Sequence, residues 1–204
     1  MTKCVLNNGD IAVATLRTPS NLDALRAEYP SSDKLLIIKL DVTKSKEISS
    51  AFKEIKDKLG RIDYVYNNAG YPVVGEVEGV GEADAKAMFE VNFWGAMNVA
   101  KEALEFFREV NKPQGGYLLN ISSTAGLAAK PLIGWYTASK HGKHPLHVEA
   151  PCLSHNCHID MHTALEGVTE TLAKEIDPEW NIKVRLSCHR GANFLTPPHV
   201  DFPP

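Results

Sequence analysis

The chain has 204 residues, of which 44 % are hydrophobic and 23 % are charged, and its formal net charge is −3. These values suit one soluble domain with a substantial core and give no electrostatic basis for binding nucleic acid or an anionic membrane. The sequence contains neither an apolar run long enough for a membrane helix nor a signal-peptide core, so we expect a cytoplasmic protein.

The first third of the chain alternates predicted helices with predicted strands. Residues 5–8 look like the end of a helix that stops at Gly9, and residues 10–16 form an apolar run typical of a buried strand. Pro19 can occupy the first turn of a helix that reaches about Tyr29.

Two more elements precede the middle of the chain. Residues 35–40 are the next predicted strand, and Thr43 is a candidate N-cap for a helix that ends near Gly60. Apolar residues recur along this helix at intervals of three or four, which indicates that one face belongs to the core.

Residues 62–66 read as a short strand that leads into Asn67-Asn-Ala-Gly70. Small residues at such a position let the backbone approach a ligand, and Asn side chains can tie neighbouring strands together. Residues 71–81 are predicted to form a loop, and a long helix is predicted from Glu82 to Val110. That helix carries Asn92 on an apolar face, where an amide needs hydrogen-bond partners.

Three side chains, with a hydroxyl, a phenol and an ammonium group, follow one another along the next part of the chain. Ser123 ends the predicted strand that begins near Tyr117, and Tyr136 and Lys140 lie one helical turn apart. A neighbouring cation stabilises a phenolate, which lets a tyrosine exchange a proton with a carbonyl or alcohol oxygen. The alternative is that Tyr136 and Lys140 are an ordinary surface pair.

These motifs in this order resemble the short-chain dehydrogenase/reductase family. The resemblance begins near Asp10, is interrupted between His141 and Ala164, and fades after Val184. It implies one Rossmann-like α/β domain over residues 1–204, built on a doubly wound parallel sheet. It also implies an oxidoreductase that interconverts a carbonyl and a secondary alcohol by NADP(H)-dependent hydride transfer.

The resemblance assigns four catalytic residues. Ser123 would bind the substrate oxygen and Tyr136 would transfer the proton. Lys140 would stabilise the Tyr136 phenolate and bind the cofactor ribose, and Asn92 would extend the proton relay. For Asn92 the alternative is a buried amide whose hydrogen bonds are merely structural.

The same resemblance assigns cofactor contacts to Arg17, Asp41, Asn68 and Gly70, together with the catalytic tyrosine and lysine. A basic residue at the end of the first predicted strand suits the 2′-phosphate of NADP, although Arg17 could simply face solvent. Asp41 would contact the adenine, or would only cap the following helix. Asn68 and Gly70 would line the adenosine ribose.

The chain departs from the family at both ends. The strand and the Gly-rich phosphate-binding turn that open such proteins are missing, and so is the C-terminal strand. Without its central member, the sheet either leaves backbone groups unpaired or brings the neighbouring strands together. The residues after Val184 do not match the family, and we interpret them as the product of a shifted reading frame.

Residues 142–163 look like an insertion into the helix that carries Tyr136 and Lys140, because Pro145 and Pro151 exclude a continuous helix. We interpret the segment as translated intron. A zinc module is the alternative, but the spacing matches no standard zinc site, so we expect no metal. Its ligands would be Cys152, His155, Cys157, His158 and His162.

A small-molecule carbonyl or alcohol is the expected partner, and a homo-oligomer is possible in this fold. Apolar residues on the predicted pocket rim suggest a lipophilic substrate. These residues are Tyr71, Val73, Val74, Leu132 and Trp135. The alternative to an enzyme is a catalytically inactive protein that acts by association, pairing with a complete relative through the helix from Glu82 to Val110.

Overall fold

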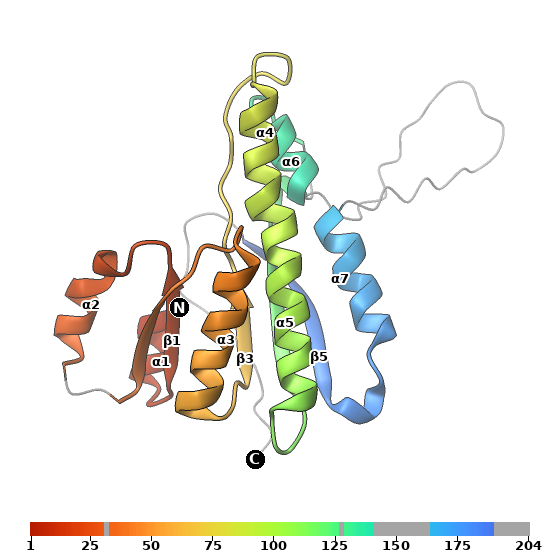
Figure 1. Ribbon diagram of the computed structural model, residues 1–204. Coiled ribbons are helices and arrows are strands. Elements are labelled where there is room, and N and C mark those ends of the chain that lie inside the picture. The colour runs from red at the N-terminus through yellow and green to blue at the C-terminus, as the bar shows by residue number, and fades with distance from the viewer. Residues whose placement is uncertain (31–32, 127–128, 141–163, 190–204) are drawn as a thin grey trace.

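The computed structural model describes residues 1–30, 33–126, 129–140 and 164–189. Within these residues five strands alternate with helices, and in Figure 1 the strands run upward while the helices between them return downward. The strands are β1 (Ala12–Leu16), β2 (Leu35–Lys39), β3 (Tyr64–Asn67), β4 (Gly116–Ser123) and β5 (Ile182–His189). This alternation confirms the predicted parallel α/β architecture.

The strands belong to two separate parallel sheets. In the first, β1 pairs with β2 from Ala12 opposite Leu35 onward. In the second, the order is β3-β4-β5, with Tyr64 opposite Tyr117 and Tyr117 opposite Lys183. No hydrogen-bonded ladder joins β1 to β3 among the described strands. Among the described strands, β1 and β3 are therefore not brought together into one ladder.

The helices of the first half have the predicted positions. They are α1 (Thr2–Asn7), the 3-10 helix η1 (Pro19–Leu22), α2 (Asp23–Glu28) and α3 (Ser45–Leu59). Gly9 and Gly60 have positive φ angles of 85° and 71°, which suits glycine at a helix end. The expected cap was wrong, because α3 has Lys44 at its N-cap and Thr43 instead bonds to Asp41.

The predicted long helix is interrupted. It consists of α4 (Glu82–Phe89), the π-helical segment η2 (Glu90–Gly95) and α5 (Ala96–Glu109). A Cβ on Gly95 would lie 2.8 Å from the side chain of Val42, so η2 passes close to the loop after β2. A π-helical turn often marks a functional position in a helix. Here it contains Asn92.

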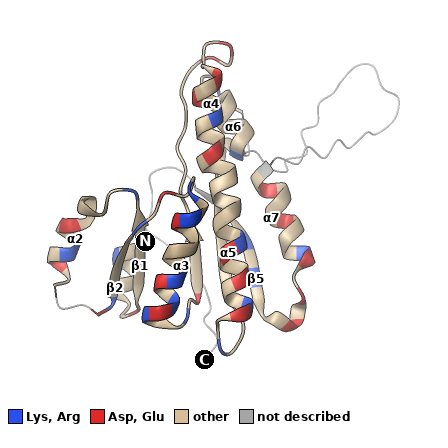
Figure 2. Ribbon diagram, viewed as in Figure 1, with Lys and Arg blue, Asp and Glu red and all other residues tan. Residues whose placement is uncertain are grey.

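The core lies between the sheets and the helices α3 and α5. Ile48, Phe52, Phe106, Phe107 and Leu118 belong to one buried cluster that also includes residues of β2 and β5. Lys, Arg, Asp and Glu lie along the outward sides of α3 and α5 (Figure 2). In the described ranges, no helix combines the length and apolarity that crossing a membrane requires.

The C-terminal part begins with the 3-10 helix η3 (Thr124–Gly126) and α6 (Gly134–Lys140), followed by α7 (Ala164–Glu175) and the 3-10 helix η4 (Pro178–Trp180). The strand β5 extends from Ile182 to His189 and pairs with β4 along its whole length. The proposed insertion at 142–163, with its histidines and cysteines, lies outside the described residues.

Candidate active site

The predicted site residues come from one end of the strands. Arg17 follows β1, Asp41 lies just beyond β2, Asn68 follows β3, and Ser123 is the last residue of β4. Because all these strands are parallel, their carboxyl ends lie on the same side of the fold, where open α/β sheets bind ligands. Of the remaining candidates, Gly70 lies in the loop after β3, and Asn92, Tyr136 and Lys140 lie on helices.

Asn92 is fully buried, with an exposed fraction of 0 %. Its Oδ1 accepts a hydrogen bond from the backbone N of Tyr71, and its Nδ2 donates to the backbone O of Tyr71, each at 3.0 Å. The same Nδ2 also donates to Ser139 Oγ at 3.0 Å. The amide therefore fixes the start of the loop after Gly70 and connects it to α6.

Lys140 is buried directly beside this amide. Its Nζ donates to the backbone O of Ile121 at 2.9 Å, and only 4 % of the residue is exposed. A Cβ on Gly70 would lie 3.4 Å from Lys140 Nζ and 3.0 Å from Asn92 Oδ1. Burial lowers the pKa of Lys140 to about 8. Gly70, Asn92 and Lys140 thus lie close together.

Tyr136 and Ser123 lie at the edge of this cluster. Tyr136 is half-buried one turn before Lys140 on α6, and its backbone O accepts a hydrogen bond of 2.8 Å from Ser139. Ser123 is also half-buried, and its Oγ accepts a bond of 3.2 Å from the backbone N of Ala125. Both side chains are more accessible than Lys140, which suits groups that meet a substrate.

Polar residues that the motif analysis did not assign hold this framework in place. Ser122 Oγ donates to the backbone O of Lys140 at 2.9 Å and thereby ties β4 to the end of α6. Ser139 bonds to Asn92, as described above. Both serines are neighbours of predicted catalytic residues, and their burial is what distinguishes them from ordinary surface serines.

The first Asn of the Asn67-Asn-Ala-Gly70 motif has the predicted structural role. Asn67 Nδ2 donates to Asn120 Oδ1 at 2.9 Å, across the β3–β4 pair, and to the backbone O of Ala96 at 2.7 Å. Asn120 Nδ2 donates in turn to Thr169 Oγ1 at 3.0 Å. Asn68 and Gly70 are exposed and lie beyond this buried network.

Arg17 and Asp41 follow β1 and β2, whereas the Lys140 cluster lies near the ends of β3 and β4, in the other sheet. Asp41 Oδ1 accepts bonds from Thr43 Oγ1 at 2.8 Å and from Thr43 N at 3.0 Å. The Thr43 hydroxyl and amide lower the pKa of Asp41, and the charges of Lys44 and Arg17 add to this effect. Arg17 itself is exposed. These bonds stay within the turn before α3, whose N-cap is Lys44 without a side-chain capping bond, so Asp41 does not cap that helix.

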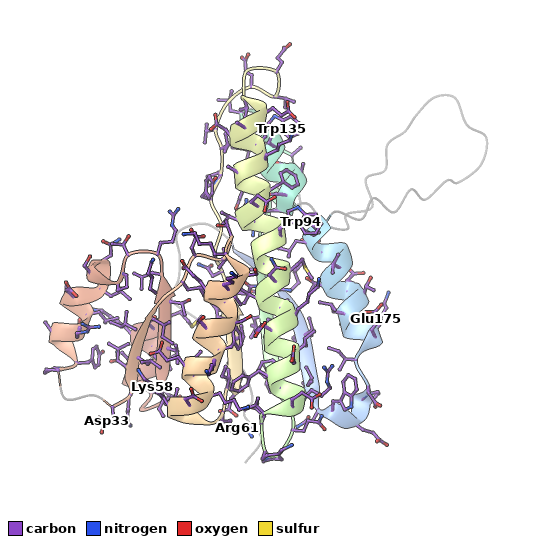
Figure 3. All side chains as sticks on the ribbon, viewed as in Figure 1. Asp33, Lys58, Arg61, Trp94, Trp135 and Glu175 are labelled. Carbon is purple, nitrogen blue, oxygen red and sulfur yellow. The ribbon has the colours of Figure 1, made fainter. Side chains whose placement is uncertain are left out.

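Exposed apolar residues rim the upper part of the molecule, where α4 and α6 lie side by side (Figure 3). Trp135 Nε1 donates to the backbone O of Val77 at 3.0 Å, and Gly75 N donates to the backbone O of Leu132 at 2.7 Å. These bonds attach the loop 71–81 to the segment that leads into α6.

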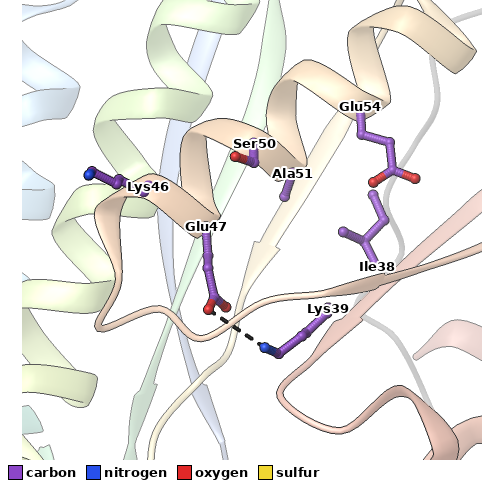
Figure 4. A pocket seen from close by; sticks show the side chains of 7 residues that line it. All are labelled: Ile38, Lys39, Lys46, Glu47, Ser50, Ala51 and Glu54. Atoms are coloured by element: carbon purple, nitrogen blue, oxygen red, sulfur yellow. Dashed lines mark ion pairs between the residues drawn. The ribbon is translucent and has the colours of Figure 1, made fainter.

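A separate cleft of about 330 Å³ lies between β2 and α3. Figure 4 shows that its lining includes the ion pair of Lys39 and Glu47, whose charged atoms are 3.8 Å apart. The cleft contains none of the predicted catalytic residues. It is therefore distinct from the cluster around Lys140.

The chain matches the family model described as short chain dehydrogenase over residues 1–182. It is 37 % identical over 186 residues to the uncharacterized oxidoreductase C162.03 of Schizosaccharomyces pombe, covering 91 % of this chain and 53 % of that protein. It is 36 % identical over 177 residues to the oxidoreductase calM of Penicillium decumbens, covering 85 % of this chain and 50 % of that protein. The chain thus spans about half the length of these curated relatives.

Solved structures give the same result for the fold. A short-chain dehydrogenase from Streptomyces avermitilis is 29 % identical, with a TM-score of 0.71 over 90 % of this chain and 58 % of that one. A structure of ElxO with NADP bound is 24 % identical, with a TM-score of 0.72 over 90 % of this chain and 64 % of the ElxO chain. Together with the matching family model and the buried Asn92–Lys140 cluster, these likenesses establish that the chain belongs to the short-chain dehydrogenase/reductase family.

Proposed function

We propose that this chain carries the site of an NADP(H)-dependent oxidoreductase that interconverts a carbonyl and a secondary alcohol. The observation that supports this most is the burial of the Lys140 ammonium between Ile121, Gly70 and Asn92, one helical turn from Tyr136. A buried cation is costly, and its retention one helical turn from a tyrosine is typical of a site for proton transfer.

The residues present fit a nicotinamide dinucleotide. Asn68 and Gly70 are exposed, and a Cβ on Gly70 would lie 3.4 Å from Lys140 Nζ and 3.0 Å from Asn92 Oδ1. Asn68, Gly70 and Lys140 would hold the ribose groups, and Arg17 would face the 2′-phosphate of NADP. The cofactor, when bound, supplies the hydride.

The protein side chains would handle the proton and the substrate oxygen. Ser123 would donate a hydrogen bond to that oxygen, and Tyr136 would give it a proton during reduction or take one during oxidation. Lys140 would stabilise the phenolate form of Tyr136 by its charge. Asn92 would keep the loop after Gly70 and the helix α6 at a fixed distance through its bonds to Tyr71 and Ser139.

The test is NADPH binding and turnover by the 204-residue chain, with cyclic ketones and aromatic ketones as trial substrates. Tyr136→Phe should retain NADPH binding and lose about 100-fold or more in kcat. The matched control is Tyr29→Phe. The Tyr29 hydroxyl follows α2 and bonds to Asn7 at the end of α1, away from the candidate site residues. A folded chain that binds no NADPH, or a Tyr136→Phe variant with full activity, would contradict the proposal.

A further inference from the structure

Ser122 has two close oxygen neighbours, each of which ordinarily accepts hydrogen bonds. Its Oγ lies 2.9 Å from the backbone O of Lys140 and 2.8 Å from Oε1 of Glu166. Glu166 is the third residue of α7 and reaches the end of β4 from 44 positions away in the sequence. No step of the proposed reaction uses this carboxyl group.

The Ser122 hydroxyl cannot make both contacts as full hydrogen bonds. A serine hydroxyl has one hydrogen to donate, whereas a backbone carbonyl and an ionised carboxylate only accept. One hydrogen shared between two acceptors makes each branch weaker than a normal bond, yet both distances lie in the range of full O–H···O bonds. With an ionised Glu166, one pair of these oxygens would therefore be in contact with no hydrogen between them.

The three residues are almost completely shielded from solvent. The exposed fraction is 3 % for Ser122, 4 % for Lys140 and 6 % for Glu166. A carboxylate buried to this extent loses most of its hydration, and two acceptor oxygens in contact repel each other more strongly in a low-dielectric interior than in water. Burial therefore favours the neutral form of Glu166, whose O–H can supply the missing hydrogen.

Charges around Glu166 do not all favour the same form. The first turn of α7 favours a negative charge through the helix dipole, and so does Lys140 on α6, which packs against α7. Glu170, one turn further along α7, disfavours it. The dipole contributes less than the burial of a carboxylate costs, and the Lys140 ammonium already donates to the backbone O of Ile121. The balance remains in favour of the neutral carboxyl group.

We propose that Glu166 is a positioning residue held in its neutral form, whose carboxyl O–H donates to Ser122 Oγ. The hydrogen of Ser122 is then left for the backbone O of Lys140, so that both contacts are full hydrogen bonds. This relay joins α7 to β4 and β4 to the end of α6. It thereby positions Ser123, the next residue of β4, relative to Tyr136 on α6. The catalytic consequence rests on the proposed function, whereas the protonation of Glu166 does not.

The first test reads the protonation of Glu166 without turnover. The 204-residue chain, labelled with carbon-13 at its glutamate carboxyl carbons, should show a protonated-acid resonance at pH 7 that Glu166→Gln removes and Ser122→Ala shifts. Glu102, which accepts a bond from exposed Ser49, is the matched control and should give a carboxylate resonance. A folded chain with no protonated glutamate resonance, or one that neither variant affects, would overturn the proposal.

The second test measures the positioning effect on turnover. Glu166→Gln keeps an N–H donor for Ser122 and should retain kcat within about threefold, whereas Glu166→Leu should lose about tenfold or more. Ser122→Ala should lose as much as Glu166→Leu, and the double variant no more than either single one, because both act through one relay. Equal kcat values for the Gln and Leu variants would contradict the positioning role.

The two tests separate this proposal from the proposed function. If the unchanged chain shows no turnover with any substrate, the proposed function fails, and the carbon-13 resonance of Glu166 still decides whether its carboxyl group is neutral. If the chain is active and Glu166 gives a carboxylate resonance at pH 7, the proposed function stands and the role of Glu166 is overturned.

Discussion

The side-chain amide of Asn92 donates to the hydroxyl of Ser139 at 3.0 Å, and Ser139 directly precedes Lys140. This bond joins the π-helical segment η2 to the helix α6, and the two bonded residues are 47 positions apart along the chain. It also places the amide in the same buried space as the Lys140 ammonium. This one buried amide therefore links η2, the loop after Gly70 and α6.

Replacement of Asn92 by Ala should destabilise the fold. The change removes the bonds to Tyr71 N, Tyr71 O and Ser139 and leaves partly buried backbone groups and a buried hydroxyl without these partners, at a cost of about 3 kcal/mol in the free energy of unfolding. Urea unfolding would measure it. Asn98→Ala on α5, where the asparagine is half-buried, is the control and should cost less than about 1 kcal/mol. Equal losses would show that the Asn92 bonds contribute little.

Lys140 should make stability rise with pH in the alkaline range. Burial lowers the pKa of Lys140 to about 8 in the folded chain, compared with about 10.4 when unfolded. Between these values the unfolded chain binds more protons, so the free energy of unfolding increases with pH. Below about pH 8 both states are protonated and the full penalty of the buried charge is present.

The measurement for this prediction is urea unfolding at pH 7.5 and pH 10 for the wild type and for Lys140→Met. Other titrating groups are shared, so the difference between the two proteins isolates the lysine. The wild type should gain about 2–3 kcal/mol relative to Lys140→Met over this range. An unchanged difference would mean that the ammonium keeps an ordinary pKa in the folded chain.

Gly116→Ala should be strongly destabilising at the start of β4. A Cβ at this position would lie 2.4 Å from Cδ1 of Phe107, a fully buried ring. The ring cannot move without disturbing the core, so we expect a loss of about 2–3 kcal/mol, measured by thermal or urea unfolding. Gly79→Ala is the control, because its nearest contact would be an ordinary 3.6 Å. The prediction fails if both variants unfold at the same urea concentration.

Arg17→Ala should discriminate between the two nicotinamide cofactors. A guanidinium beside a 2′-phosphate makes charge-assisted bonds, so its loss should weaken NADPH binding about tenfold and leave NADH binding unchanged. Fluorescence titration of each cofactor would measure this. Arg26→Ala on α2 removes an exposed arginine away from the strand ends and should change neither affinity. Parallel losses for NADPH and NADH would remove the basis for the NADP assignment.

The sequence predicted those parts of the fold that local patterns specify. Apolar runs predict strands, glycines predict helix ends, and the i, i+4 spacing of Tyr136 and Lys140 predicts that both lie on one helix. The structure confirms these elements. The site motif likewise identified Lys140 and Asn92, which the structure brings together with Gly70.

Other features depend on tertiary contacts and could not be predicted from local patterns. The π-helical turn at η2 fits the close approach of Gly95 to Val42, which lies far away in the sequence. The length of β5 comes from its pairing with β4, since Arg185 and Ser187 lack the apolar character of a buried strand. The roles of Ser122 and Ser139 arise only when β4, α6 and η2 meet.

The division of the strands into two sheets also affects how the protein opens. Ile38 and Leu40, in and just after β2, share one core cluster with α3, α5 and β4, so side-chain packing holds the halves together where no described backbone ladder does. A region attached by fewer contacts opens at a lower free energy than the centre of the core. The unit of β1, β2 and α2 should therefore open as a subglobal step, with faster amide exchange than the β4–β5 pair.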